Sequence, residues 1–246
     1  MTTYKILVAY DGTKYNGWQI QRSTENTIQG KLSAVLSKMS GSVVEVHGSG
    51  RTDAGVHAKC QVASFSLDGD FSDQEILSYL NRYLPDDIAV LTVEKTDSRF
   101  HARLSCKQKT YRYRIHTSII PDVFGRKYVY TYLDKPLNVE LMRKAAAHLI
   151  GTHDFKAFCG NPHFKKSSVR TIFSIKITGD MSGITLDFTG DGFLQNMVRI
   201  LTGTLIEVGN GGIKEDEIPG ILVSKDRQKA GFTAPPQGLT LLGAEY

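Results

Sequence analysis

The residues best suited to chemistry lie in one short glycine-rich stretch, Gly48-Ser-Gly-Arg-Thr-Asp-Ala-Gly-Val-His-Ala58. Apolar alternating runs at 43–47 and 61–67 flank it, so the pattern predicts a tight loop joining two strands. Glycine lets such a backbone approach a ligand closely, and two strands make a rigid base for a reactive carboxylate. Arg51 and Asp53 are also ordinary turn residues, so the loop pattern alone leaves a purely structural interpretation open.

Arg199 is the second unusual residue, because it interrupts the apolar run Met197-Val-Arg-Ile-Leu201 of an expected helix. Burying a guanidinium without a partner is costly. The side chain must therefore extend to solvent or meet a carboxylate from elsewhere in the chain. If the partner is Asp53, the pairing would keep that carboxylate ionised and oriented.

A basic segment with interleaved aromatic residues runs from Arg99 to Arg114 and contains no acidic residue. In a strand, Tyr111 and Tyr113 would share one face while Arg112 and Arg114 share the other. Such a surface can stack a base and hold phosphates, although a solvated charged edge would have the same composition. A second basic run, 163–170, supplies further expected phosphate contacts: Lys165, Lys166 and Arg170.

Several other chemistries fail on residue identity. A phosphatase nucleophile loop around Asp11 would need an acidic residue where Ala9 stands, and the chain has no Gly-x-x-x-x-Gly-Lys-Ser/Thr phosphate loop. A zinc nucleobase deaminase needs a Pro-Cys-x-x-Cys sequence, and the three cysteines are isolated. The residues therefore predict no metal site.

The elements expected to position these residues are interspersed without a strict alternation of strand and helix. Strand patterns occur at 4–10, 43–47, 61–67, 89–95, 110–116, 127–132, 171–178 and 184–189, and helical patterns at 26–39, 72–83, 138–150 and 193–208. The fold class expected is α+β with mixed, mainly antiparallel sheets. The polar, basic stretch 98–109 predicts a division into residues 1–104, with the Asp53 loop, and 105–246, with the Tyr111 strand and the Arg199 helix.

The composition is that of an ordinary globular protein, with 246 residues and 41% hydrophobic residues. A formal net charge of +5 and a pI of about 9.0 favour an anionic partner such as nucleic acid. The three cysteines are far apart and follow no regular spacing, which suits a reducing compartment. The N-terminus has no signal-peptide pattern. We therefore expect a cytoplasmic protein without a membrane span.

Taken together, the motifs resemble those of the tRNA pseudouridine synthases of the TruA type. Five ordered segments carry the resemblance along nearly the whole chain, at 10–19, 50–57, 100–113, 192–203 and 234–239. One departure is Cys60, where the family commonly has glycine. The resemblance implies two similar α+β halves with joined sheets around a central basic cleft, helices on the outer faces, and a homodimer.

The same resemblance implies the reaction and the roles of the residues. Uridine is isomerised to pseudouridine at positions 38, 39 and 40 of the tRNA anticodon stem-loop, without cofactor or metal. Asp53 would be the catalytic carboxylate, Arg199 its partner, Arg51 an aid to flipping the nucleotide, and Tyr111 the residue that holds the uracil. Two alternatives remain at this point: a non-catalytic RNA-binding protein, and a pseudouridine synthase for another RNA position.

Overall fold

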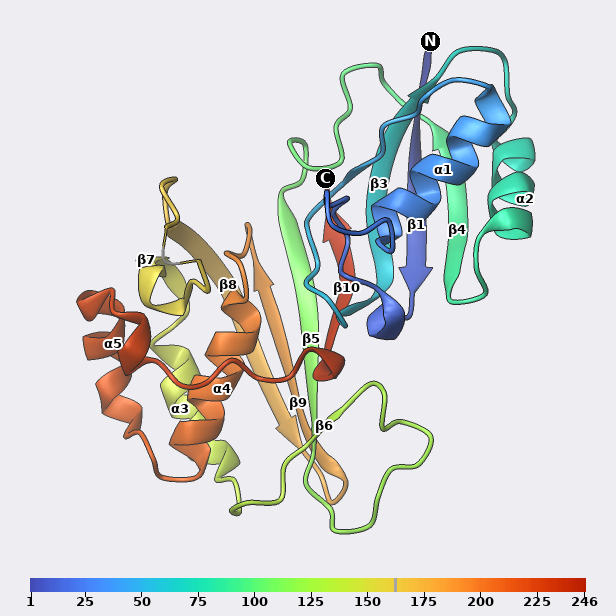
Figure 1. The fold of residues 1–246 in the computed structure, drawn as a ribbon. Coiled ribbons are helices and arrows are strands. Elements are labelled where there is room, and N and C mark those ends of the chain that lie inside the picture. The colour runs from blue at the N-terminus through green and yellow to red at the C-terminus, as the bar shows by residue number, and fades with distance from the viewer. Residues whose placement is uncertain (162) are drawn as a thin grey trace. The chain divides into compact units, whose positions relative to one another are not determined.

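The computed structural model describes residues 1–161 and 163–246, which form two compact units (Figure 1). The first unit comprises residues 1–107 together with 241–246, and the second comprises residues 108–240. The sequence-based division at 104/105 left the last six residues in the second half. Their place in the first unit is visible in two hydrogen bonds, from Lys107 N to Glu245 O (2.8 Å) and from Tyr246 Oη to Ala102 O (2.7 Å).

The sheet of the first unit has the order β4-β1-β3, with all neighbours antiparallel. Its strands are β1 (Thr2–Tyr10), β2 (His47–Gly48), β3 (His57–Leu67) and β4 (Ile88–Lys95), and β2 pairs with β3. Every second residue of β1 from Tyr4 to Tyr10 is buried, as expected for a strand with one face on the core. A register shift between Val8 and Tyr10 marks a bulge facing the start of β3.

Two helices cover this sheet, α1 (Ile28–Ser40) and α2 (Asp73–Tyr83), and α2 packs beside both β4 and α1 (Figure 1). Thr27 caps α1 by accepting from Gly30 N, and the αL residue Gly41 ends it. Ser72 and Glu75 form a capping box at the start of α2. These caps explain why both helices lie close to their predicted ranges.

The second unit contains the sheet β5-β9-β8-β7, antiparallel throughout, with the short β6 added parallel to β5. The strands are β5 (Gln108–His116), β6 (Tyr130–Thr131), β7 (Gly151–Asp154), β8 (Val169–Gly179) and β9 (Gly183–Gly190). The helices are α3 (Val139–Ala147), α4 (Met197–Gly209) and α5 (Ile218–Ser224), and α3 packs against α4 and β8. The last strand, β10 (Leu239–Glu245), carries the chain from this unit into the first.

The mixed, mainly antiparallel α+β class is therefore confirmed. The strand predicted at 43–47 was wrong for most of its length, because only His47 and Gly48 pair with β3 and residues 43–46 have no regular structure. Val44 and Val46 are nevertheless buried. The alternation of apolar residues at 43–47 therefore indicated which side chains are buried, and not a paired strand. Among the described residues, no helix is long and apolar enough to cross a membrane.

Candidate active site

The loop predicted to carry the chemistry connects β2 to β3 in the first unit and spans Ser49 to Val56. Thr52 at its centre is buried, with 6% of its surface exposed, while its neighbour Arg51 is exposed and Asp53 is half-buried. The loop therefore directs one polar side chain inward and presents a cation and a carboxylate on either side of it. This arrangement suits a carboxylate that must reach an external substrate while its backbone stays fixed.

The beginning of the loop is fastened to β3 by Gln61, whose side chain is fully buried. Its Oε1 accepts a hydrogen bond from Ser49 Oγ (2.6 Å), and its Nε2 donates one to Gly50 O (2.9 Å). The backbone adds a bond from Ser49 N to Val62 O (2.7 Å). Both polar atoms of the Gln61 amide are therefore hydrogen-bonded, as buried polar groups usually are. The same side chain holds two successive residues of the loop.

The centre and end of the loop rest on the N-terminal motif, residues 10–19. Tyr10 Oη and Thr52 Oγ1 share a buried hydrogen bond of 2.8 Å. Trp18 N donates to Thr52 O (3.0 Å), and Gly55 N donates to Tyr15 O (3.3 Å). The motif that opens the sequence is therefore the support of the loop that carries Asp53.

Two glycines of that motif are needed because the two segments approach so closely. A Cβ on Gly12 would lie 2.0 Å from Val56 O, and one on Gly17 would lie 2.6 Å from Thr52 O. Gly17 also has a φ of +85°, which disfavours any side chain. The glycines of the N-terminal motif hence serve close packing against the loop.

Asp11 and His57 join the same two segments, and sequence reasoning assigned neither a role. Asp11 accepts from Thr13 N (2.9 Å), and its Oδ1 lies 3.1 Å from His57 Nδ1. The buried His57 ring is also 3.1 Å from Gly12 N. Local sequence patterns could not predict this pairing, because the two residues are more than forty positions apart. The sequence showed only that each residue belongs to a motif.

Tyr111 lies on β5 in the second unit, beside Phe188 of β9 in register. Its ring is buried, with 7% exposed, and meets the Phe193 ring edge-on at 5.3 Å between centroids. Tyr113 is fully buried on the same face, whereas Arg112 and Arg114 alternate with them and are more exposed. The strand alternation expected from the sequence is confirmed, and it directs these two cations away from the tyrosine face.

Arg199 lies in the first turn of α4 and is half-buried. Its Nε donates to Ala234 O (2.7 Å), and its Nη1 donates to Asn196 Oδ1 (3.1 Å). Asn196 precedes the helix with a φ of 59°, in the left-handed region that few residues other than glycine adopt. The guanidinium is thus held by a backbone carbonyl and an amide within its own unit.

The closing motif, residues 234–239, supports both Arg199 and the tyrosine strand. Directly after the carbonyl that binds Arg199, Pro235 O accepts from Tyr113 Oη (2.7 Å). Gly238 faces the same ring, where a Cβ would lie 2.6 Å from Cζ of Tyr113. Burial raises the pKa of Tyr113, and the charge of Arg199 acts in the opposite direction. Tyr113 is therefore a structural residue that ties β5 to this motif.

The predicted phosphate-binding residues of the second unit differ in their surroundings. Arg112 forms a two-pronged ion pair with Asp187, with both N–H···O distances at 2.7 Å, and Arg170 donates to Ser167 O and Val169 O. Lys165, Lys166 and Arg114 are exposed. The carboxylate of Asp187 already neutralises the charge of Arg112. The three exposed cations are therefore better suited to contacting phosphates.

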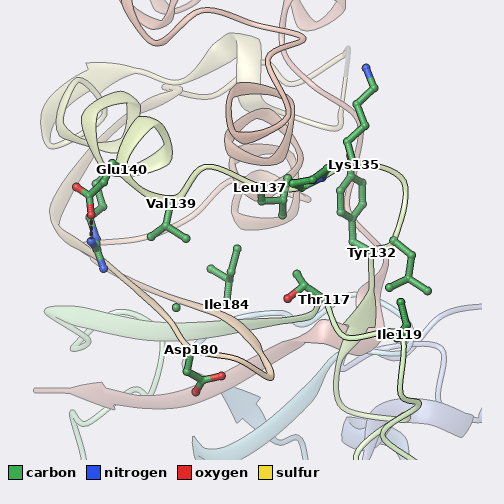
Figure 2. A pocket seen from close by; sticks show the side chains of 13 residues that line it. Thr117, Ile119, Tyr132, Lys135, Leu137, Val139, Glu140, Asp180 and Ile184 are labelled. Atoms are coloured by element: carbon green, nitrogen blue, oxygen red, sulfur yellow. Dashed lines mark hydrogen bonds and ion pairs between the residues drawn. The ribbon is translucent and has the colours of Figure 1, made fainter.

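An open hollow of about 640 Å³ in the second unit contains none of the predicted site residues (Figure 2). Ile119, Tyr132 and Ile184 contribute to its walls, and its Arg143 is paired with Glu140 and donates to Ile177 O (2.9 Å).

Within residues 1–161 and 163–246, no three His, Cys, Asp or Glu side chains are grouped so as to hold a metal ion. The candidate residues consequently form two groups, the anchored Asp53 loop of the first unit and the Tyr111–Arg199 region of the second.

Comparison with known proteins agrees with the motifs. A family model described as tRNA pseudouridine synthase matches residues 6–105 and 145–246. A tRNA pseudouridine synthase A from Bacillus sp. (strain KSM-64) is 47% identical, and one from Thermoanaerobacter sp. (strain X514) is 45% identical. A tRNA pseudouridine synthase A 2 from Bacillus anthracis is 43% identical, and each alignment covers 100% of both chains. The chain belongs to the tRNA pseudouridine synthase family.

Proposed function

We propose that this protein isomerises uridine to pseudouridine at positions 38, 39 and 40 in the anticodon stem-loop of tRNA, in the cytoplasm. The observation that carries the proposal is the half-buried Asp53, held on an anchored loop in a chain that matches tRNA pseudouridine synthases A over its full length. The surplus of basic residues suits a polyanionic substrate.

The reaction explains why a carboxylate on a rigid loop is needed. The bond between C1′ of the ribose and N1 of uracil must break, the base must turn, and C5 must bond to C1′. A stacked base in a stem cannot reach a protein side chain, so the nucleotide is flipped out at a cost of a few kcal/mol. Asp53 can then attack the sugar, attack the base or remove a sugar proton, and each route requires its carboxylate to touch the nucleotide.

The other predicted residues complete this scheme. Tyr111 holds the flipped uracil, and Arg51 assists the flipping from its exposed position next to Thr52. Arg199 pairs with Asp53 and keeps the carboxylate ionised. Its hold by Ala234 O and Asn196 supports this role, because a guanidinium fixed in direction can pair with a carboxylate at little cost in side-chain entropy.

The decisive test is to map pseudouridine in total tRNA from a strain in which the gene is deleted. The proposal expects loss of the modification at positions 38, 39 and 40 and its restoration by the purified protein. Unchanged modification at all three positions, with loss elsewhere, would show a synthase for another RNA site. Binding of tRNA without any change in modification would show a non-catalytic RNA-binding protein.

Lys165 and Lys166, with Arg114 and Arg170, are proposed to contact tRNA phosphates, with Arg112 contributing through the side of its guanidinium not paired with Asp187. Lys165→Ala should weaken binding of all substrate tRNAs alike and reduce the salt dependence of log Kd by about one unit, because one fewer counterion is released. Fluorescence anisotropy across a salt series measures this slope. The control is Lys144→Ala, which removes an exposed lysine of the same unit on α3, away from the strand face that carries Arg112 and Arg114. An unchanged slope, or a loss for one tRNA alone, contradicts the phosphate role.

We further propose that the protein is a homodimer. Exposed apolar side chains gather on the segment 119–124 and on the turn that joins β8 to β9: Ile119, Ile120, Phe124 and Met181 are each at least 73% exposed. Ile120 and Met181 line a common hollow, so the two segments are neighbours. Apolar patches of this kind mark interfaces between proteins.

Phe124→Asp should therefore shift the mass in sedimentation equilibrium from dimer to monomer, because it places a charge in the apolar contact. Val223, which is 81% exposed and lies outside these segments, provides the matched control Val223→Asp. A wild-type protein that sediments as a monomer would contradict the dimer, and a dimer resistant to Phe124→Asp would exclude this surface.

A further inference from the structure

Two buried polar side chains, Tyr10 and Gln61, hold the Asp53 loop and have no part in the roles proposed above. Tyr10 is 4% exposed and Gln61 is fully buried. We propose that Tyr10 and Gln61 are positioning residues, which set the path of the chain from Ser49 to Asp53 and so place the carboxylate for reaction. The inference rests on the proposed function of Asp53.

Tyr10 fixes the residue directly before Asp53. It ends β1, its ring packs beside Trp18 with centroids 6.2 Å apart, and its hydroxyl meets Thr52 Oγ1 at 2.8 Å. Burial raises the pKa of Tyr10, so the hydroxyl remains protonated and serves as a fixed hydrogen-bonding group. A shift of Thr52 would move Arg51 and Asp53 with it, because they are its chain neighbours.

Gln61 fixes the same segment from the other end. Through Ser49 and Gly50 it holds the two residues that precede Arg51, using both polar atoms of its amide. Tyr10 acts from β1 and Gln61 from β3, and their side chains also interact with each other, so together they restrain the short run from Ser49 to Thr52. Misplacement of a catalytic group by about 1 Å is enough to lower a rate about 100-fold.

The experiment must separate positioning from ordinary core stability, and Tyr4 offers a matched control. Tyr4 also lies on β1 and is fully buried. Its hydroxyl donates a hydrogen bond to Phe71 O (2.8 Å), a residue outside the Asp53 loop. Tyr4→Phe and Tyr10→Phe each remove one hydroxyl from a buried ring. Both should lower Tm by about 2–4 °C.

The two variants should differ in catalysis. With saturating tRNA and well below Tm, Tyr10→Phe should lower the single-turnover rate about tenfold and leave Kd for tRNA within about twofold, while Tyr4→Phe stays within about twofold in both. Gln61→Met, which keeps the size of the side chain and removes both hydrogen bonds, should lower the rate at least as much. Equal rates for Tyr10→Phe and Tyr4→Phe would overturn the positioning role of Tyr10.

Thr52 provides a second, independent route if a core variant folds poorly. Thr52→Val should be as slow as Tyr10→Phe, Thr52→Ser should restore the rate, and the double variant should be no slower than either single one. Full activity of Thr52→Val would overturn the proposal. Asp53→Asn measured in parallel distinguishes failure of the proposed function from failure of the positioning role. An active Asp53→Asn protein refutes the proposed function itself. An inactive Asp53→Asn beside fast Tyr10→Phe and Thr52→Val refutes positioning alone.

Discussion

Asp53→Asn should abolish pseudouridine formation while tRNA affinity changes by no more than a few-fold. Asparagine keeps the shape of the side chain and removes the charge needed for attack or for proton removal. The anchors of the loop at Ser49, Gly50 and Thr52 are unchanged by this substitution, so the loop should keep its place. Single-turnover assays on purified protein measure the rate, and anisotropy measures Kd.

Asp86→Asn, at an exposed carboxylate of the same unit, is the control for loss of one negative charge. It should keep the wild-type rate. Turnover by Asp53→Asn above a small residue, for example within tenfold of wild type, would contradict the assignment of Asp53 as the catalytic group.

Arg199→Ala should lower the rate at neutral pH by about 100-fold, which corresponds to a loss of roughly 2.7 kcal/mol of transition-state stabilisation. The proposed pairing with Asp53 would make that carboxylate easier to ionise, so after loss of Arg199 a higher pH should restore part of the rate. Arg199→Lys should recover little, because an ammonium cannot reproduce the guanidinium's bonds to Ala234 O and Asn196. The pH profile of kcat is the measurement.

Arg143 makes a close control for this experiment. It too donates from Nε to a backbone carbonyl, Ile177 O, and from Nη1 to a residue three positions earlier, Glu140. Arg143→Ala should therefore cost similar local bonding in the same unit without an effect on catalysis. An Arg199→Ala protein with the rate and pH profile of Arg143→Ala would show that Arg199 only anchors its helix.

The sequence predicted the parts of this fold that local patterns encode. Helices were expected at 26–39 and 72–83 from caps and side-chain periodicity, and the structure has them at Ile28–Ser40 and Asp73–Tyr83. The alternation expected on β5 is also present. The helix expected from Phe193 begins only at Met197, because residues 193–196 turn through the left-handed Asn196 before the helix starts. Apolar periodicity cannot register such a backbone change.

Tertiary pairing is what the sequence could not provide. The motif residues Asp53, Tyr111 and Arg199 were named from their segments, but nothing local links Gln61 to Ser49, Tyr10 to Thr52 or Arg112 to Asp187. The last pair in particular gives an arginine expected to meet RNA a partner within the protein. Partners of this kind lie opposite one another only once the strands are in register.

The many anchors of the Asp53 loop also determine which molecule must deform during recognition. Segment 49–56 is bonded to β3 and to the N-terminal motif at its beginning, centre and end, so it has little conformational freedom left to lose. An induced-fit movement of this loop toward a stacked uridine would break those bonds. The substrate must accordingly supply the flexibility, and anticodon arms that unpair easily should be modified faster than rigid ones of the same sequence at the target. The amides of Ser49 and Gly55 should resist hydrogen exchange equally in the free and the tRNA-bound protein.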